Sequence, residues 1–400
     1  MSVAMEKRAA FRSLGEKTPN ELFGTLPTPC YIIDESALRH NGEILSSVMY
    51  HTGCKILLAQ KAFSNYSFYS LLSPYLAGTE ASGLYEARLG KEQMPQGEVH
   101  VFCGAYRDDD FEQLLRYADH IVFNSPRQLE KFGQRAKDGG KSVGLRINPE
   151  CSTQEGHGIY DPCAPGSRLG TTRAVWNLQM TDKLISLLDG LHFHTLCEQN
   201  SDALETTLFA VEEKFGDILP QMKWLNMGGG HHITKDGYDI PRLEKCITSA
   251  QKKWNLQVYL EPGEAVALNA GYLACRVLDI VKSGNSCIAI LDTSAACHMP
   301  DVMEMPYIPP LYGTEPDAKG FYPYQLGGPT CLSGDMIGSY CFNHKLHEGD
   351  LLLFGDMAIY TTCKNNTFNG MPLPNIWKRT ENGQMECLTH FGYEDFLMRL

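Results

Sequence analysis

Short apolar runs alternate with amphipathic stretches from about residue 28 to residue 262, and this alternation limits the possible folds most strongly. In order, the runs are CYIIDE, KILLAQ, EVHVFCG, HIVFN, VGLRIN, LHFHTL, KWLNMGGG and VYLEPGE. Strands that are each followed by a helix predict a parallel sheet with helical crossovers. Eight such units over this length are typical of a (β/α)8 barrel, which usually has about 250 residues.

The predicted barrel spans residues 28–265, and the segment GTEASGLYEARLG within it also has the pattern of a strand that enters a helix, so the strand count is uncertain by one. After Ala265 helical periodicity becomes scarce. The strand-like runs there are CRVLDIV, CIAILD, LLLFGD and TTCKNNTFNG, separated by Gly, Pro and Asn. This pattern predicts a mainly antiparallel β-domain over residues 266–400, which residues 1–27 are expected to join.

The composition describes a globular chain, since 43% of its 400 residues are hydrophobic and 20% are charged. No window approaches the roughly 18 to 20 consecutive apolar residues of a membrane span, and residues 1–17 lack the apolar core of a signal sequence. We therefore expect a cytoplasmic protein. The net charge, 35 − 47 = −12, disfavours nucleic acid and anionic membranes as partners. The 14 cysteines lack the paired spacing of metal sites, which predicts reduced thiols.

Two candidate features lie at the predicted C-terminal mouth of the barrel. Lys61 follows the strand KILLAQ, where an amine can form a Schiff base or can simply be solvated. Gly228, Gly229 and Gly230 follow the strand that starts at Trp224, and backbone N–H groups in such a run can approach a phosphate closely. A plain tight turn is the alternative, because the run matches neither a dinucleotide-binding fingerprint nor a Walker loop.

His192 and His194 lie on one face of their strand, because side chains alternate with period two. His194 could stack on a flat ring, bind a metal, or be a hydrogen-bonded core side chain. The metal alternative would draw on nearby residues, namely Cys197, Glu198, His231 and His232.

Two charged residues are embedded in apolar strands. Glu261 ends the run VYLE at the expected barrel mouth, where a carboxylate needs a cationic partner or a proton. A pyridinium N–H is one such partner, and an internal salt bridge is the other. Arg146, within the run VGLRIN, is a cation that could form that salt bridge.

Cys331 stands in the turn-rich segment that runs from Gly327 to Asp335. Such a segment exposes a thiol rather than burying it, which permits reactivity without proving it. An inert cysteine is the alternative.

Taken together, these motifs resemble those of the fold-type III pyridoxal-phosphate decarboxylases, which include ornithine and diaminopimelate decarboxylases. The motifs that carry the resemblance run from Lys61 to Gly370 and comprise Lys61-Ala62-Phe63, Phe193-His194, Gly228-Gly229-Gly230, Glu261-Pro262-Gly263, Cys331 before Gly334-Asp335, and Tyr360 before Phe368-Asn369-Gly370. The resemblance implies the alanine racemase/ornithine decarboxylase fold, a barrel followed by a β-domain. It also implies pyridoxal 5'-phosphate as the cofactor.

The resemblance further implies a role for each motif residue. Lys61 would carry the cofactor as a Schiff base and Glu261 would keep the pyridine nitrogen protonated, while His194 would stack on the ring and Arg146 would support its side groups. The phosphate would rest on the glycine run and the Tyr360 hydroxyl. Cys331, supplied by the second chain of a head-to-tail homodimer, would protonate the carbanion.

Within this group the sequence resembles the carboxynorspermidine/carboxyspermidine decarboxylases, through the strings GLHFHTLCE, EPGE and HMPDVMEMPY. Ornithine and diaminopimelate decarboxylases typically have Glu-Pro-Gly-Arg, whereas Glu264 replaces the arginine here. The resemblance thus implies a cationic substrate, a carboxylated triamine. The carboxylates expected to bind it are Glu264, Asp292, Asp301, Glu304 and Asp335.

Three alternatives stay open within the same fold. A diaminopimelate-type amino-acid decarboxylase is disfavoured by Glu264, and a racemase is disfavoured by the Cys331 motif. A regulatory paralogue without catalysis would be expected to have lost motif residues. The sequence does not choose between carboxynorspermidine and carboxyspermidine, because one methylene is worth only about 1 to 3 kcal/mol.

Overall fold

The computed structural model of the chain describes residues 9–154, 161–315 and 321–400, and the chain divides into two compact units. His40–Val266 form the first, called the barrel unit here. Met1–Arg39 and Ala267–Leu400 form the second, called the β unit, of which residues 1–8 lie outside the described residues.

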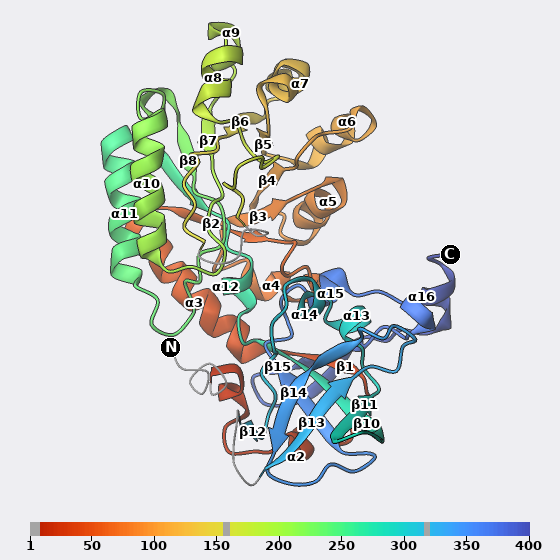
Figure 1. Cartoon of the computed structure of the whole chain (residues 1–400). Helices are drawn as coiled ribbons and strands as arrows, with labels where there is room; N and C mark the ends of the chain where they lie inside the picture. The colour runs from red at the N-terminus through yellow and green to blue at the C-terminus, as the bar shows by residue number, and fades with distance from the viewer. Residues whose placement is uncertain (1–8, 155–160, 316–320) are drawn as a thin grey trace. The chain divides into compact units, whose positions relative to one another are not determined.

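The barrel unit is a closed ring of eight parallel strands, β2 to β9, in which β2 pairs with β9 to complete the ring (Figure 1). This confirms the (β/α)8 prediction. The strands are β2 Lys55–Ala59, β3 Gly78–Ala81, β4 Glu98–Phe102, β5 His120–Phe123, β6 Ser142–Arg146, β7 Gly190–His192, β8 Trp224–Asn226 and β9 Gln257–Leu260.

Helices surround the barrel because each buries one apolar face. In α11 (Ile240–Trp254) the buried residues Leu243, Ile247 and Trp254 recur with the helical period, the Asp239 side chain caps the first turn, and Asn255 ends the helix in the left-handed conformation. The other helices of this part of the chain are α3 Glu35–Thr52, α4 Tyr69–Leu72, α5 Leu84–Gln93, α6 Asp108–Tyr117, α7 Pro126–Asp138, α8 Arg173–Gln179, α9 Asp182–Ile185, α10 Ser201–Phe215 and α12 Glu264–Ala267. Two short 3-10 helices are η2 Tyr66–Phe68 and η4 Leu219–Gln221.

Trp224 packs against two glycines of neighbouring strands. A Cβ atom built on Gly190 would lie 2.0 Å from ring carbon Cδ2 of Trp224, and one on Gly144 would lie 2.3 Å from Cη2. The indole N–H donates to the Ser142 hydroxyl at 2.8 Å. Glycine at positions 144 and 190 therefore makes room for the indole.

The β unit contains a nine-stranded, mostly antiparallel sheet, as the sequence predicted. Its path is β12-β14-β13-β11-β10-β1-β16-β17, with β15 also paired to β10. The strands are β1 Cys30–Asp34, β10 Gly271–Ser283, β11 Ser286–Leu291, β12 Thr314–Glu315, β13 Tyr322–Gly327, β14 Met336–Phe342, β15 Leu351–Gly355, β16 Asn375–Arg379 and β17 Met385–Thr389. Apolar side chains from β10, β11, β13 and β14 form its main core.

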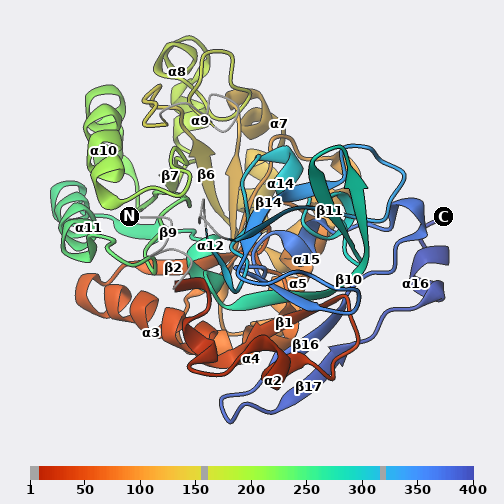
Figure 2. The ribbon, with the colours of Figure 1, turned by 60° about the horizontal axis from the view of Figure 1, so that its bottom comes forward.

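The assignment of CYIIDE to the barrel is wrong. This run is β1, which pairs antiparallel with β10 and parallel with β16 inside the β unit (Figure 2). The barrel strand that replaces it is β3, the run GTEA. All five residues of β1 are buried, so its composition is that of any central strand and does not reveal which sheet it joins. The barrel unit accordingly begins at His40 rather than at residue 28.

The run TTCKNNTFNG is also not a strand. It forms α15 (Thr361–Lys364) and η5 (Phe368–Gly370), because Asn and Gly favour turns and Asn369 adopts a left-handed φ of 57°. The remaining helices of this unit are η1 Arg12–Leu14, α2 Pro19–Phe23, α13 Ala295–His298, α14 Asp301–Glu304 and α16 Tyr393–Leu397. Across the described part of the chain, no helix has both the length and the apolar character needed to span a membrane.

Candidate active site

The predicted site residues of the barrel unit all lie where strands end. Arg146 is the last residue of β6 and Glu261 directly follows β9. Lys61 and His194 follow β2 and β7 by two residues each, and the glycine run begins two residues after β8. These are C-terminal strand ends, the face at which barrels of this kind bind ligands and perform chemistry.

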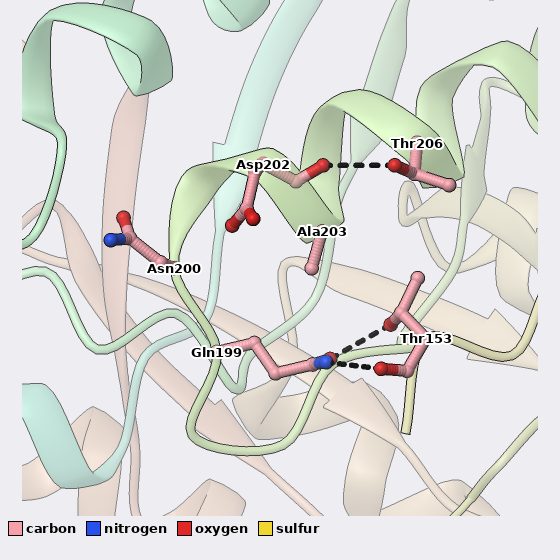
Figure 3. A pocket seen from close by; sticks show the side chains of 6 residues that line it. All are labelled: Thr153, Gln199, Asn200, Asp202, Ala203 and Thr206. Atoms are coloured by element: carbon pink, nitrogen blue, oxygen red, sulfur yellow. Dashed lines mark hydrogen bonds between the residues drawn. The ribbon is translucent and has the colours of Figure 1, made fainter. Parts of the chain in front are cut away.

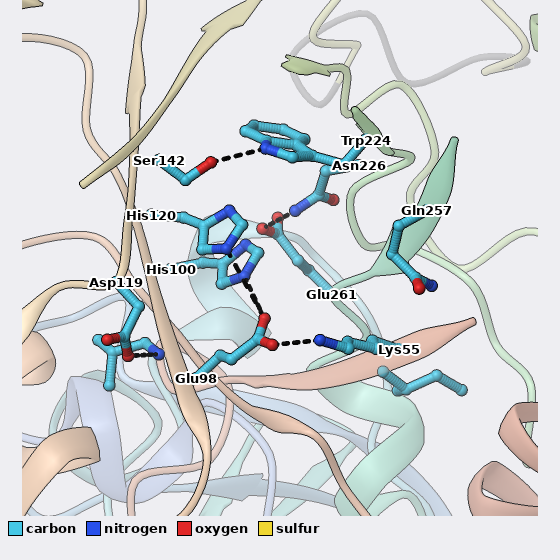
Figure 4. Close-up of polar contacts among 12 residues, drawn as sticks. Lys55, Glu98, His100, Asp119, His120, Ser142, Trp224, Asn226, Gln257 and Glu261 are labelled. Carbon is cyan, nitrogen blue, oxygen red and sulfur yellow. Dashed lines mark hydrogen bonds and ion pairs between the residues drawn. The ribbon is translucent and has the colours of Figure 1, made fainter. Parts of the chain in front are cut away.

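Glu261 is a buried carboxylate held by two donors. It is 6% exposed, and it accepts a hydrogen bond from Asn226 Nδ2 at 2.5 Å (Figure 4). It accepts a second one from His192 Nε2 at 3.0 Å. Burial by itself raises the pKa of Glu261, but His192, His100 and Asn226 outweigh burial, so its pKa is lowered. Burial also lowers the pKa of His192, which as a neutral ring donates from Nε2. Glu261 is therefore a fixed anion, suited to face a protonated ring nitrogen.

The glycine run makes different contacts from those predicted. Gly228 N–H donates to Asn226 Oδ1 at 2.9 Å, and Gly229 N–H donates to His194 Nδ1 at 2.8 Å. A Cβ atom on Gly229 would lie 2.4 Å from the Glu261 carbonyl oxygen. Two of the three N–H groups thus orient side chains of the site. Gly230, with φ of 81°, keeps an N–H group that makes no hydrogen bond among the described residues.

His194 and Arg146 support one another. His194 Nδ1 accepts a hydrogen bond, so this nitrogen carries no proton, and burial together with the charges of Lys61 and Arg146 lowers the pKa of the ring well below its usual range. The Arg146 guanidinium donates to the His194 carbonyl at 3.1 Å and lies 4.6 Å from the centre of the Phe102 ring. Burial lowers the pKa of Arg146 to about 10, which leaves it a cation at neutral pH. A neutral imidazole therefore sits beside a fixed positive charge.

Glu80 belongs to the site, although the sequence analysis missed it. It lies in β3, is 5% exposed, and its pKa is raised well above the usual value by burial and then by the charge of Glu261. The amine of Lys61 acts in the opposite direction. Lys61 itself is exposed and makes no hydrogen bond or ion pair within the described residues. An acidic residue embedded in a short buried strand was the available signal, the same one that identified Glu261.

Glu264 pairs with a histidine. Its Oε2 atom lies 3.2 Å from Nε2 of His232, and the His232 side chain is nearly buried. Burial tends to lower the pKa of His232, but the nearby carboxylate of Glu264 outweighs burial, so the pKa is raised. A carboxylate with a protonatable partner therefore occupies the position where the ornithine and diaminopimelate decarboxylases that the motifs resemble typically have arginine.

A second polar cluster lies at the opposite ends of the strands (Figure 4). Glu98 Oε2 is 3.2 Å from His100 Nε2 and 3.8 Å from His120 Nε2, and the two imidazole rings stack with centroids 3.9 Å apart. Three such groups could in principle bind a metal ion, but the other Glu98 oxygen pairs with Lys55. Lys55, Glu98 and His120 each begin a strand, so this cluster stabilises the N-terminal end of the barrel.

A small polar pocket also follows β6 and β7 (Figure 3). Gln199 connects its walls by donating to the Thr153 carbonyl at 2.6 Å and accepting from the Thr153 hydroxyl at 2.8 Å. Asp202, in the first turn of α10, is the one charged side chain among the described lining residues. The pocket is lined by Thr153, Gln199, Asn200, Asp202, Ala203 and Thr206.

In the β unit, Cys331 is exposed on a loop that is held from within. Its backbone N–H donates to Asn369 Oδ1 at 2.9 Å, which joins the two motifs that the sequence analysis had identified separately. The carboxylate of Asp335 is buried and accepts from Ser294 Oγ at 2.9 Å, Thr330 Oγ1 at 2.7 Å and the Ala296 N–H at 3.2 Å. Asp335 therefore orders the loop through these three hydrogen bonds, and its contact with a substrate stays a prediction.

The other predicted acidic residues of the β unit also have internal partners. Asp292 accepts from Thr28 Oγ1 at 2.6 Å and from the Arg276 N–H at 2.8 Å, so both of its oxygens are used. Asp301 and Glu304 both pair with Lys364. Tyr360 has a left-handed φ of 58°, a strained conformation for a residue that is not glycine. Glu264 is the predicted substrate-binding carboxylate that belongs to the barrel unit, where it follows Glu261-Pro262-Gly263 at the end of β9.

Comparison with known proteins identifies the family. Residues 30–358 match the family model described as pyridoxal-dependent decarboxylase, C-terminal sheet domain. This chain belongs to the pyridoxal-dependent decarboxylases. The predicted family resemblance is thereby confirmed.

Relatives of this decarboxylase cover nearly its whole length. The carboxynorspermidine/carboxyspermidine decarboxylase of Campylobacter jejuni is 41% identical over 94% of this chain and 98% of its own. The carboxyaminopropylagmatine decarboxylase of Synechocystis is 39% identical over 95% of this chain and 97% of its own. The crystal structure of carboxynorspermidine decarboxylase from Campylobacter jejuni complexed with norspermidine covers 94% of this chain and 100% of its own, with a TM-score of 0.86 and 40% identity.

Proposed function

We propose that this protein decarboxylates carboxynorspermidine or carboxyspermidine with pyridoxal 5'-phosphate bound at the barrel mouth. The observation that carries the choice of substrate is the pairing of Glu264 with His232 at the position of the usual arginine. A carboxylate there favours a cationic amine. The near full-length similarity to a decarboxylase of these two compounds supports the same choice.

The described side chains fit the cofactor. Lys61 offers an amine that has no hydrogen bond or ion pair with the described residues, and Glu261 offers a buried, ionised carboxylate for the ring nitrogen. His194 would face the ring, while Gly230 N–H and Tyr360 would hold the phosphate. When bound, pyridoxal phosphate withdraws electrons from the substrate α-carbon, so that the carboxylate can leave as carbon dioxide.

The chain's own residues would then control protons. Glu261, fixed by Asn226 and His192, would hold a proton at the pyridine nitrogen. The Cys331 thiol would donate a proton to the carbon that has lost its carboxylate, and solvent would return a proton to the thiolate. The raised pKa of Glu80 favours its neutral form beside Lys61, so Glu80 would not form a tight ion pair that keeps the amine from reacting.

We further propose that the functional form is a head-to-tail homodimer in which each site combines Lys61 of one chain with Cys331 of the other. The exposure of Cys331 on an internally ordered loop supports this arrangement. Mixing inactive Lys61→Ala and Cys331→Ala proteins should then restore activity, up to about one quarter of wild type for random pairing. No recovery after dissociation and reassembly would contradict the shared site.

The direct test of function is carbon dioxide release by the purified, cofactor-loaded protein. Carboxynorspermidine, carboxyspermidine, meso-diaminopimelate and ornithine would be compared side by side, with Lys61→Ala as the inactive control. Turnover of either carboxylated triamine supports the proposal. Turnover of diaminopimelate or ornithine alone would replace it with an amino-acid decarboxylase, and no turnover at all would favour a regulatory role.

A second candidate substrate is carboxyaminopropylagmatine, which the similarity to the Synechocystis relative favours. Agmatine carries a guanidinium group, and a carboxylate can bind guanidinium through two parallel hydrogen bonds. Glu264 is therefore compatible with this substrate too. Including carboxyaminopropylagmatine in the same assay ranks it directly against the triamines.

A further inference from the structure

Glu198 lies directly beside the glycine run and His232. The residue after it, Gln199, forms an isolated parallel bridge with His231. Gln199 N–H donates to the Gly230 carbonyl at 3.0 Å, and His232 N–H donates to the Gln199 carbonyl at 3.3 Å. These backbone contacts fix the end of the β7 loop against the end of the β8 loop, so Glu198 belongs to the barrel mouth.

The backbone of Glu198 is strained. Its φ of 53° lies in the left-handed region, which costs a residue other than glycine free energy. The side chain is exposed. Burial of an exposed side chain stabilises the fold little, so packing does not offset the cost of this backbone conformation. A strained acidic residue at a ligand-binding face therefore points to a role in binding.

His232 provides an independent sign of a binding site. The residue is only 5% exposed, and its Nδ1 atom has no hydrogen-bond partner among the described residues. Its Nε2 atom faces Glu264 Oε2 at 3.2 Å without the alignment of a good hydrogen bond. A buried imidazole with incomplete hydrogen bonding is costly unless a ligand or proton changes its contacts.

Glu198 and Glu264 act on the same groups. Burial lowers the pKa of His232, Glu264 and then Glu198 raise it, and Lys235 lowers it slightly, with a net increase. The same two carboxylates add to burial in raising the pKa of the Cys197 thiol to about 12. Two acids thus surround one imidazole, which gives the group a charge of −1 when His232 is protonated and −2 when it is neutral.

We propose that Glu198, His232 and Glu264 form a subsite for an ammonium group of the substrate, in which the arriving cation displaces a proton from His232 to solvent. Glu198 is then a specificity-determining residue, and His232 maintains the charge balance of the empty subsite. This inference rests on the proposed function and specifies how the site recognises its substrate class. No bond other than N–H is broken, and the proton leaves with the buffer.

The subsite explains discrimination against amino-acid substrates. The far end of diaminopimelate carries a carboxylate beside its ammonium, and two glutamates would repel that carboxylate. A triamine has no carboxylate at its far end. The substrate's own charge pattern therefore separates the two classes.

The test is calorimetric titration of the cofactor-loaded protein with norspermidine and with spermidine, in buffers of different ionisation enthalpy at neutral pH. The wild type should release protons on binding, and His232→Gln should release fewer. Glu198→Gln should weaken binding and raise KM by about tenfold or more, with kcat and the visible absorbance of the cofactor little changed. Glu198→Asp should recover part of the affinity.

Glu213→Gln is the matched control, because Glu213 is an exposed acid on α10 and should leave affinity and proton release unchanged. Unchanged KM and affinity in Glu198→Gln would overturn the subsite, as would equal proton release by the wild type and His232→Gln. If His232→Gln does not fold, the Glu198 variants decide alone. Failure of the proposed function would be a different result, in which the wild type releases no carbon dioxide from any carboxylated triamine.

Discussion

Replacing Asn226 with aspartate tests the hydrogen bonds that hold Glu261. Asn226 is fully buried, its Nδ2 donates to Glu261 Oε1 at 2.5 Å, and its Oδ1 accepts from Gly228 N–H. Aspartate keeps the acceptor but replaces the donor with a second carboxylate. Two carboxylates in contact cannot both be ionised without a large cost, so the Asn226→Asp variant should bind a shared proton.

The expected destabilisation depends on pH in a defined direction. At pH 5 the carboxyl group introduced by the substitution is protonated and can donate to Glu261 in place of the amide. Because one hydrogen bond replaces another, the free energy of unfolding should fall by only about 0.5–1.5 kcal/mol relative to the wild type. The shared proton raises the pKa of the pair above its unfolded value, so stability is lost as the pH rises. At pH 8 the cost should approach about 3–5 kcal/mol, that of an uncompensated buried charge.

The wild type has the opposite dependence. The pKa of Glu261 is lowered in the folded state, so its contribution is present above the unfolded pKa and is lost as the pH falls. The two stability curves should therefore converge at low pH and separate at high pH.

Urea unfolding followed by tryptophan fluorescence at several pH values between 5 and 8 measures this difference. Asn124→Asp is the matched control, since within the described residues the Asn124 side chain hydrogen-bonds to backbone groups, the Arg168 carbonyl and the Gly170 N–H. It should show a smaller change with pH. If the difference in the free energy of unfolding between Asn226→Asp and the wild type stays constant from pH 5 to pH 8, the electrostatic argument is refuted.

Three further outcomes are expected. Gly190→Ala should destabilise the protein by about 1–3 kcal/mol or more, because the added methyl meets the Trp224 ring, and a melting temperature equal to that of wild type would contradict this packing. Cys331→Ala should lower kcat by about 10²- to 10⁴-fold as an acid is lost, while the cofactor absorbance stays unchanged; an undiminished kcat would exclude the thiol as the acid. Asp335→Asn should cost about 1–3 kcal/mol in unfolding experiments, since its buried carboxylate accepts three hydrogen bonds, and an unchanged urea midpoint would show that those bonds contribute nothing.

The barrel could be predicted because its strands repeat a local pattern, but the sheet that a buried strand joins is not local. The run CYIIDE and the run KILLAQ are both largely apolar and buried, yet β1 pairs with β10 and β16 of the β unit while β2 opens the barrel. The difference lies in pairing partners hundreds of residues away. The composition of a single strand does not identify these partners.

The candidate site was predictable where a polar residue interrupts an apolar strand end, as at Glu261 and Arg146. Glu80 in β3 and Asn226 at the end of β8 are also polar residues in short buried strands, but neither was predicted as a site residue. Hydrogen-bond partners were beyond the sequence: nothing in the glycine run indicates that Gly229 N–H serves His194 rather than a phosphate. Likewise, a carboxylate such as Asp292 gives no sign in the sequence that both of its oxygens are already engaged.

The position of β1 in the β unit has a consequence for biosynthesis. Cys30 lies opposite Ala274 on one side and Asn375 on the other, so β1, which is translated before the barrel unit, completes its pairing only when β10 and β16 have emerged. His40–Val266 can assemble from contiguous chain in the meantime. Contacts between distant segments form slowly and leave apolar surface exposed while they wait. The nascent chain therefore carries β1 as an unpaired, largely apolar strand while the whole barrel unit is translated, and protection by chaperones should matter most during that interval.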